Sequence, residues 1–151
     1  MAKKKHDKGA GSTPATVQLE KAGVEFHVYE YEHSNDHMDD GYGVEAATKL
    51  GFDEHQVFKT LMADTGSERV VGVVPVSGHM DLKALAAAAG AKKASMADPK
   101  VAMRESGYVV GGISPLGQKT HHKTVLDESA LQFDQILVSG GKRGQIGRAH
   151  V

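Results

Sequence analysis

The chain has 151 residues, 40% of them hydrophobic, and a formal net charge of -1. This length predicts one domain with a single sizeable core, and the near-zero charge excludes a strong overall attraction to nucleic acid, so any polyanion site must be a local cluster. The chain contains no cysteine, which excludes disulfides, cysteine-ligated zinc and a cysteine nucleophile, and which fits a reducing compartment.

Two further features bear on where the protein works. No apolar run approaches the roughly 20 residues that cross a membrane. The basic start of the chain is not followed by the apolar segment of a secretory signal. We therefore expect a cytoplasmic protein without a membrane partner.

The first twelve residues, MAKKKHDKGAGS, are charged, contain glycine and show no periodicity. We expect a flexible basic tail over residues 1–12, followed by a single domain over residues 13–151. The lysines of the tail suit RNA phosphates, but we favour a solvated tail without a partner, because short basic tails are common.

From residue 13 onward, helix and strand patterns alternate irregularly. Thr13 followed by Pro14 is typical of a helix start, and Gly23 of its end. Further helices are predicted from capping residues and terminal glycines over residues 44–50, 82–89, 99–106 and 128–133. Strands are predicted from apolar runs or apolar–polar alternation over residues 24–31, 57–62, 69–76, 124–126 and 136–138. The pattern predicts one mixed α/β domain, a sheet with helices packed on it.

The end of the chain is less regular. Residues 145–151, QIGRAHV, have neither helix nor strand periodicity. We expect an atypical, truncated C-terminus.

The most informative stretch is residues 107–117, GYVVGGISPLG, called the glycine loop below. A strand-like pattern stops at Gly111 and Gly112, which lack a Cβ and let a ligand approach main-chain N–H groups. Pro115 then stiffens the far side of the loop. An ordinary tight turn between two strands is the alternative, because glycine and proline mark turns in general.

Lys59 is the second candidate. Residues 57–62 are expected to be extended, so that Lys59 shares one face with Val57 and Leu61. A lysine among apolar residues either reaches past them into water or serves a site, where it holds a phosphate or orients an ester carbonyl. Thr60, beside it, offers a hydroxyl on the opposite face or in the adjoining turn.

The third candidate is residues 139–144, SGGKRG, called the basic turn below. Its glycines expose amides, and Lys142 and Arg143 add positive charge, as in turns that contact phosphate. It is not a P-loop, since the G-x-x-x-x-G-K-[ST] spacing is absent. A solvated basic turn without function is the alternative.

Nine histidines raise the question of a metal. His33 and His37 lie among aspartates in the loop predicted over residues 33–43, and His121 and His122 are adjacent. Neither pair has the helical H-x-x-x-H spacing, and adjacent residues on a strand point to opposite faces, so we expect no metal. A serine triad has no local signature either, because Ser114 lies in GISPLG and not in G-x-S-x-G.

Four segments together resemble one family. GYVVGGISPLGQK, with QVFKTL, MADP and VSGGKRG, is similar to the YbaK/EbsC family of aminoacyl-tRNA deacylases, in the same order and at fitting spacing over residues 13–144. The resemblance implies the editing-domain α/β fold, with a mixed, barrel-like sheet and packed helices. It also implies an enzyme related to the editing domain of prolyl-tRNA synthetase.

The resemblance also assigns residues. The essential lysine of the family falls on Lys59, and its glycine loop falls on residues 111–115, so that Lys59, Gly111 and Gly112 are the expected catalytic residues. The expected substrate-binding residues are Tyr31, Tyr42, Thr60, Ser114, Pro115, Ser139, Lys142 and Arg143. Tyr42 is the less exact match, because phenylalanine is usual there.

The implied chemistry needs no protein nucleophile and no cofactor, because an aminoacyl ester is already activated. Backbone amides near Gly111 and Gly112 suit a developing oxyanion. In the YbaK branch the substrate is Cys-tRNA(Pro), whose thiol attacks its own ester carbonyl and leaves as a thiolactone. Lys59 would orient the substrate through phosphate or carbonyl oxygen, and a general-base role is the less favoured alternative.

The sequence leaves two alternatives open. In the first, the substrate is another misacylated tRNA, such as Ala-tRNA(Pro). In the second, the chain is a non-catalytic module that binds tRNA or a synthetase. The expected partners are the 3′ end of aminoacyl-tRNA and prolyl-tRNA synthetase. One departure bears on activity: Gln145 and Ile146 stand where the family usually has a segment with an acidic residue, before a C-terminal helix.

Overall fold

The computed structural model describes residues 12–32 and 42–150. The predicted tail therefore lies almost wholly outside the described residues, as do residues 33–41 of the predicted loop with His33 and His37. The elements in chain order are α2 (Pro14–Ala22), β1 (Phe26–Glu30), α3 (Tyr42–Leu50), β2 (Phe58–Asp64), β3 (Arg69–Pro75), α4 (Leu82–Ala88), β4 (Ser95–Met96), α5 (Pro99–Ser106), β5 (Lys123–Leu126), the 3-10 helix η3 (Glu128–Gln132), β6 (Gln135–Ser139) and β7 (Gln145–His150).

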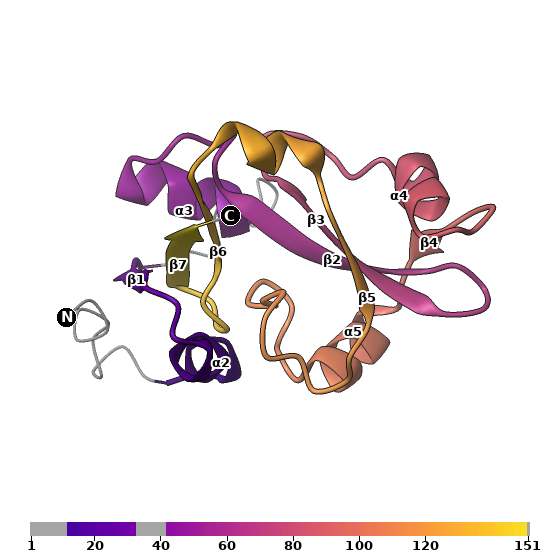
Figure 1. Ribbon diagram of the computed structural model, residues 1–151, viewed down its shortest axis with the longest axis horizontal. Coiled ribbons are helices and arrows are strands. Elements are labelled where there is room, and N and C mark those ends of the chain that lie inside the picture. Colours follow the sequence, from indigo (N-terminus) through magenta and orange to yellow (C-terminus); the bar gives the residue numbers. More distant parts are fainter. Residues whose placement is uncertain (1–11, 33–41, 151) are drawn as a thin grey trace.

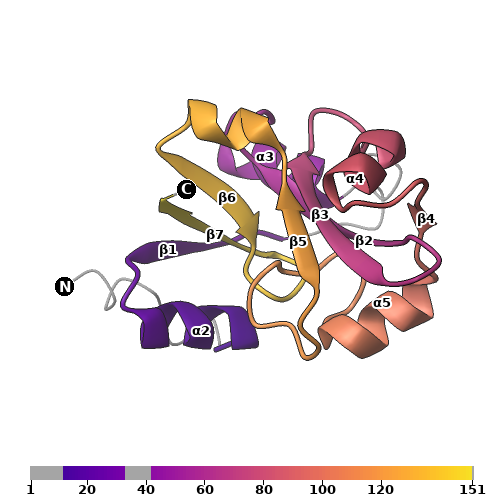
Figure 2. The ribbon, with the colours of Figure 1, turned by 45° about the vertical axis from the view of Figure 1, so that its right-hand side comes forward.

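The strands form two sheets, which lie side by side in Figures 1 and 2. One has the order β1-β7-β6 and is antiparallel. The other has the order β4-β2-β3-β5, in which only the β3–β5 pair is parallel. The mixed α/β class is confirmed.

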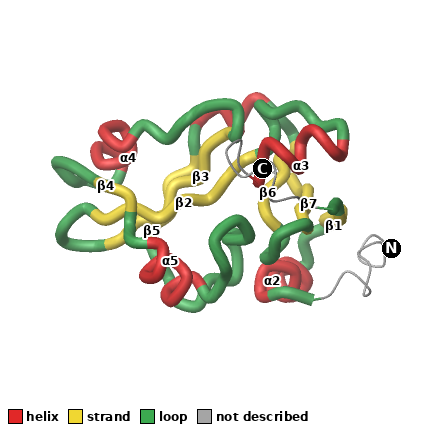
Figure 3. The backbone as a smooth tube through the Cα atoms, turned by 180° about the vertical axis from the view of Figure 1, so that it is seen from behind, coloured by secondary structure: helices red, strands yellow, loops and turns green. Residues whose placement is uncertain are grey.

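The expected barrel-like sheet is not observed, because the described strands form two open sheets. The sheets meet where β6 passes the start of β2: Val57 and Leu137 form a single parallel bridge, and the Leu137 amide donates to the Gln56 carbonyl at 3.1 Å. One bridge does not continue a ladder, so the strands form two separately hydrogen-bonded sheets, although β2 and β6 approach each other when seen from behind (Figure 3).

Helices cover both sides of the three-stranded sheet, with α3 on one side and α2 on the other (Figures 1 and 2). Ala46 and Ala47 of α3 pack with Leu137 and Ile146 in one apolar cluster. A second cluster joins the inner face of β2 to α5, through Phe58, Met62 and Ala102. The first cluster forms one wall of the candidate site described below.

The predicted helix ends are confirmed where capping residues predict them. The Thr13 hydroxyl accepts a hydrogen bond from the Thr16 amide, and Gly23 ends α2 with φ of 72°. Asp81 and Asp98 cap α4 and α5 through their carboxylates. Among the described residues, no helix is long and apolar enough to cross a membrane.

Three expectations were wrong. Residues 145–150, which lack periodicity, form β7, the central strand of the β1-β7-β6 sheet. The strand-like pattern at Val109 and Val110 is part of an irregular loop. Val24 is exposed, and the first strand begins at Phe26. In each case the partner strand, rather than the local pattern, decides whether the backbone is extended.

Candidate functional site

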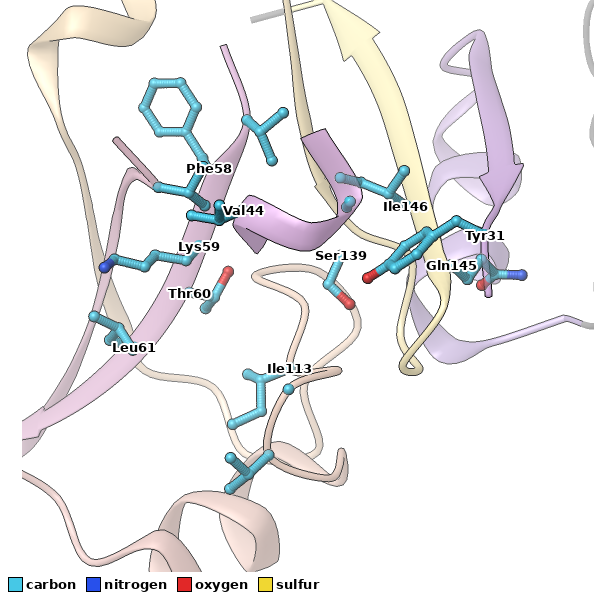
Figure 4. A pocket seen from close by; sticks show the side chains of 15 residues that line it. Tyr31, Val44, Phe58, Lys59, Thr60, Leu61, Ile113, Ser139, Gln145 and Ile146 are labelled. Carbon is cyan, nitrogen blue, oxygen red and sulfur yellow. The ribbon is translucent and has the colours of Figure 1, made fainter. Parts of the chain in front are cut away.

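A pocket of about 240 Å³ lies between β2, the glycine loop and the basic turn. Figure 4 shows side chains from these segments and from α3 around it. The pocket is lined by Tyr31, Val44, Ala46, Val57, Phe58, Lys59, Thr60, Leu61, Val76, Val110, Gly111, Ile113, Ser139, Gln145 and Ile146. It therefore gathers residues from all three segments that the sequence analysis singled out.

Strand β2 places two polar side chains on its two faces. Thr60 lies on the buried face, with Phe58 and Met62, while Lys59 and Leu61 are half-buried on the other. This alternation confirms the predicted extended segment. In Figure 4 the Thr60 hydroxyl points toward Ser139, and the Lys59 side chain extends in the opposite direction.

The Lys59 ammonium donates a hydrogen bond of 2.9 Å to the Gly78 carbonyl, in the turn after β3. Burial lowers the pKa of Lys59 from its ordinary value of 10.5, because the charged form loses hydration. An ammonium has three N–H donors, so two remain after the contact with Gly78. The side chain is thus a cation at the edge of the pocket with donors to spare.

The Thr60 hydroxyl is buried, and it finds no hydrogen-bond partner among the described residues. Such a group costs free energy in the folded protein, about 1–3 kcal/mol relative to a satisfied one. A buried hydroxyl that points into a pocket is available to a bound ligand. Thr60 is therefore a pocket-lining residue whose hydroxyl is not used by the described part of the fold.

The glycine loop approaches the basic turn backbone to backbone. A Cβ at Gly112 would lie 2.8 Å from the Lys142 Cα and 2.9 Å from the Arg143 nitrogen, closer than any side chain permits. The Gly112 amide already donates to the Val109 carbonyl at 2.9 Å. Gly111, with φ of 91°, lines the pocket, and its amide donates no hydrogen bond to any described residue. Of the two glycines, Gly111 is the one placed to meet a ligand.

We expect Gly112→Ala to lower the free energy of unfolding by about 1–3 kcal/mol, because two backbone segments must separate to admit the methyl group. For a chain of this size each kcal/mol corresponds to about 2–4 °C in the melting temperature. Thermal unfolding measures the change. Gly78→Ala is the matched control, since a Cβ at Gly78 meets nothing within 4 Å; equal melting temperatures for the two variants would contradict the close approach.

Ser139 joins the two loops. Its hydroxyl donates to the Gly112 carbonyl at 2.9 Å and accepts from the Gly141 amide at 3.1 Å. The basic turn is the hairpin loop between β6 and β7, and in it the Arg143 Nε donates to the Val110 carbonyl at 2.7 Å. Lys142 and Arg143 are exposed beside the pocket rather than inside it.

The described lining of the pocket contains no aspartate, glutamate or histidine, and Lys59 is its only charged residue. Within residues 12–32 and 42–150, no three histidine or carboxylate side chains gather as they would around a metal ion. His122 instead lies 3.0 Å from Glu105, which also pairs with Arg69 at 2.7 Å. This cluster ties the end of α5 to β3 and does not line the pocket.

With this geometry established, comparison with known proteins is informative. The model of the aminoacyl-tRNA editing domain family matches residues 41–148. The chain belongs to the aminoacyl-tRNA editing domain family. The family resemblance and the expected activity class, deacylation of aminoacyl-tRNA, are thereby confirmed.

One relative of this editing domain is a proposed Cys-tRNA(Pro)/Cys-tRNA(Cys) deacylase, EbsC, of Enterococcus faecalis. The two are 40% identical over 147 residues, which cover 95% of this chain and 85% of the relative. Among solved structures, a proposed trans-editing enzyme for prolyl tRNA synthetase has 23% identity and a TM-score of 0.77, over 91% of this chain and 84% of its own. The hypothetical protein APE2540 has 20% identity and a TM-score of 0.79, over 91% of this chain and 88% of its own. At these identities the two structures support the fold alone.

The predicted site residues of the editing domain separate into two groups. Lys59, Thr60, Gly111, Tyr31 and Ser139 all line the pocket. In Figure 4 the Tyr31 hydroxyl points toward Ser139. The structure therefore brings together residues that are up to 108 positions apart, from Tyr31 to Ser139.

The second group does not line this pocket. Ser114 is fully buried, and its hydroxyl accepts from the Leu116 amide, so it shapes the glycine loop. Pro115 lines a different, apolar cavity of about 420 Å³ between α2 and the two sheets. Gly112, Lys142 and Arg143 lie next to the pocket, and Tyr42 is the first residue of α3, with its side chain outside the described part of the structure.

Sequence reasoning missed the residues that hold the two loops in place. Thr13, treated only as a helix cap, donates its hydroxyl to the Gly140 carbonyl at 2.5 Å. Tyr108 donates to the Leu116 carbonyl at 2.6 Å, and burial raises its pKa to about 12. Gln145 and Ile146, noted only as departures, line the pocket. No local pattern signals contacts between segments 127 residues apart.

Proposed function

We propose that this editing domain deacylates Cys-tRNA(Pro) in trans, after its release by the synthetase, and that the cysteine thiol of the substrate is the nucleophile. The name of the relative at 40% identity supports cysteine as the mischarged amino acid. The trans-editing class itself follows from the family, and the substrate and the thiol mechanism are the proposed steps.

One observation carries the thiol mechanism. The described lining of the pocket offers no carboxylate, imidazole or thiol, the groups that usually activate water or attack an ester. A substrate that brings its own nucleophile needs none of them. Cysteine does so, whereas alanine does not.

The step balances without a cofactor. The substrate sulfur forms a bond to its own ester carbonyl carbon, the bond from that carbon to the ribose oxygen breaks, and the thiol proton goes to the ribose oxygen. The products are a cysteine thiolactone and tRNA with a free 3′ end. Negative charge develops on the carbonyl oxygen during this step, so positioned donors accelerate it.

The pocket supplies three kinds of donor. Gly111 and Thr60 line the pocket, and in this proposal their amide and hydroxyl donate to the carbonyl oxygen or the ribose. The Lys59 ammonium binds a phosphate or carbonyl oxygen with the donors that Gly78 leaves available. Tyr31 and Ser139 shape the wall opposite β2. The role of Lys59 is binding and orientation; a general base would have to be the neutral amine.

The test compares Cys-tRNA(Pro), Ala-tRNA(Pro) and S-methylcysteinyl-tRNA(Pro) with the wild-type protein. We expect rapid deacylation of the cysteinyl ester alone, with the thiolactone captured by an added amine. The S-methyl ester has nearly the same shape but no nucleophile, so it should persist.

Three results would overturn the proposal in whole or in part. Equal cleavage of the alanyl and S-methyl esters would indicate attack by water. Binding of tRNA without loss of any ester would indicate a non-catalytic module. Cleavage of only the alanyl ester would keep the enzyme class and replace cysteine as the substrate.

We also propose prolyl-tRNA synthetase as a partner in the cytoplasm. A net charge of -1 supports only weak attraction to the tRNA body, so the identity of the tRNA must be read by another protein. Deacylation that speeds up when the synthetase is added, at fixed Cys-tRNA(Pro), would support this partner.

A further inference from the structure

We propose that a surface beside the pocket, formed by Val109, Val110 and Lys142 and called the outer surface below, binds the unpaired nucleotides that precede the terminal adenosine of the tRNA. This inference rests on the proposed function for the identity of the ester. The partner chemistry is single-stranded RNA, with apolar faces of bases or riboses and an anionic backbone.

The apolar part of the outer surface is exposed and held in place. Val109 is 49% exposed and Val110 is 38% exposed. Their carbonyls accept hydrogen bonds from the Gly112 amide at 2.9 Å and from Arg143 Nε at 2.7 Å. Two exposed valines on a restrained loop offer a contact face at small entropic cost. Neither side chain contributes to the three apolar clusters of the described core.

The charged part adjoins the apolar part. Lys142 is exposed, and its backbone lies against Gly112, where a Cβ would approach to 2.8 Å. None of the ion pairs among the described residues uses Lys142. Proteins that bind single strands without sequence readout combine cations for the phosphates with a stacking surface for the bases, which is usually aromatic. Here Lys142 supplies the charge, and the two valines supply apolar contact in place of an aromatic ring.

The outer surface continues the pocket. Val110 belongs to both, and Gly111, which follows it, lines the pocket. The pocket, of about 240 Å³, is smaller than the roughly 300–1,000 Å³ of pockets that hold drug-sized ligands. On the proposed function the aminoacylated adenosine occupies the pocket, so the preceding nucleotides leave along its edge, where Val110 and Gly111 of the glycine loop and Ser139 of the basic turn line it.

The experiment compares two cysteinyl esters, one on adenosine alone and one on the trinucleotide CpCpA. For the wild type we expect kcat/KM to be about tenfold higher on the trinucleotide, the effect of about 1.4 kcal/mol of added contact. Val109→Ser and Lys142→Ala should each reduce this ratio toward one. Lys142→Ala should also make the logarithmic salt dependence on the trinucleotide shallower by about 0.7, the value for one lost phosphate contact with a single strand.

Matched controls use exposed residues elsewhere. Leu131, 78% exposed on η3, becomes serine, and the exposed Lys93, in the turn before β4, becomes alanine. The β4 end lies far from the basic turn in Figures 1 and 2. The controls should leave the ratio as in the wild type. If Val109→Ser and Lys142→Ala also keep the wild-type ratio of kcat/KM between the trinucleotide and adenosine esters, the proposed role of the outer surface is wrong.

A binding measurement separates this inference from the proposed function. Fluorescence anisotropy of labelled, unacylated CpCpA needs no chemistry. We expect Val109→Ser and Lys142→Ala to weaken its binding several-fold relative to the two controls, even if the wild type cleaves no cysteinyl ester. If the wild type cleaves the cysteinyl ester but all four variants bind CpCpA equally well, the proposed function stands and the proposed role of the outer surface is wrong.

Discussion

Replacing Lys59 by methionine is expected to lower kcat/KM for deacylation about 100- to 1,000-fold, the usual effect of losing one donor that stabilises a developing anion. Methionine keeps the stem that packs on β2 and removes only the ammonium. Single-turnover deacylation of Cys-tRNA(Pro) measures the change. Circular dichroism and thermal unfolding should show a folded variant, because Lys59 is half-buried and its charged group makes one backbone contact.

Lys123 offers the matched control. It begins β5, on the far side of β3 from β2. Its ammonium donates to the Ala89 carbonyl at 3.1 Å, as Lys59 donates to Gly78, and it also lies 3.4 Å from the Glu68 carboxylate. Lys123→Met removes the same kind of backbone contact, together with an exposed ion pair to Glu68, away from the pocket, and it should retain the wild-type rate. If both variants keep full activity, the Lys59 ammonium serves only to hold the turn after β3.

The pH profile follows from the same site. Burial lowers the pKa of Lys59 below its ordinary value of 10.5. Since the charged form binds the substrate, the enzymatic rate should fall as the pH rises through a pKa below 10.5, after subtraction of spontaneous ester hydrolysis. The Lys59→Met variant should lack this alkaline limb. Ionisation of the substrate thiol, with an ordinary pKa of about 8.5, raises the rate with pH in both proteins. A rise that is present in the wild type and absent from Lys59→Met would therefore indicate that the neutral amine acts as a base.

Thr60→Val is expected to reduce kcat/KM about tenfold, the effect of one lost hydrogen bond to the substrate. The same change should leave the melting temperature unchanged or raise it, because valine has nearly the same shape, favours strands and removes a buried hydroxyl without a partner. Loss of activity with a gain in stability is characteristic of a residue kept for function.

The Thr60→Ser variant is expected to show the opposite pattern from Thr60→Val. Serine keeps the hydroxyl and removes a buried methyl group, so this variant should keep most of the activity and lose about 1 kcal/mol of stability. Deacylation rates and thermal unfolding of both variants together test the role of the hydroxyl. If valine lowers the stability and leaves the rate unchanged, the hydroxyl belongs to the fold and not to the site.

The candidate site shows how far local patterns extend. Lys59 and Thr60 were predicted on opposite faces of a strand, and the structure places them so, because side chains alternate along any extended backbone. The glycines of the glycine loop and the basic turn were predicted to allow close approach to a ligand. At Gly112 the neighbour is instead the backbone of Lys142, because two loops from distant parts of the chain meet there.

Strand β7 marks the limit of the same reasoning. Its sequence, Gln-Ile-Gly-Arg-Ala-His, carries no strand pattern, yet it pairs with β1 on one side and β6 on the other. Even Gly147, which has no side chain, fits in this strand, because backbone hydrogen bonds to the two neighbouring strands hold a central strand in place. Neither neighbour is visible in the local sequence, and one of them lies more than 100 residues away.

The sequence by itself determined the helix ends, the extended segment at Lys59, the mixed α/β class and, through four motifs, the family. These depend on capping, alternation and motif spacing, which act over a few residues. Only the tertiary structure decided that the sheets stay open, that β7 is a strand, that Ser114 and Pro115 lie outside the pocket and that Thr60 and Ser139 line the same pocket. Such features depend on contacts between segments far apart in the chain, whose geometry is set by packing of the whole core rather than by any local preference.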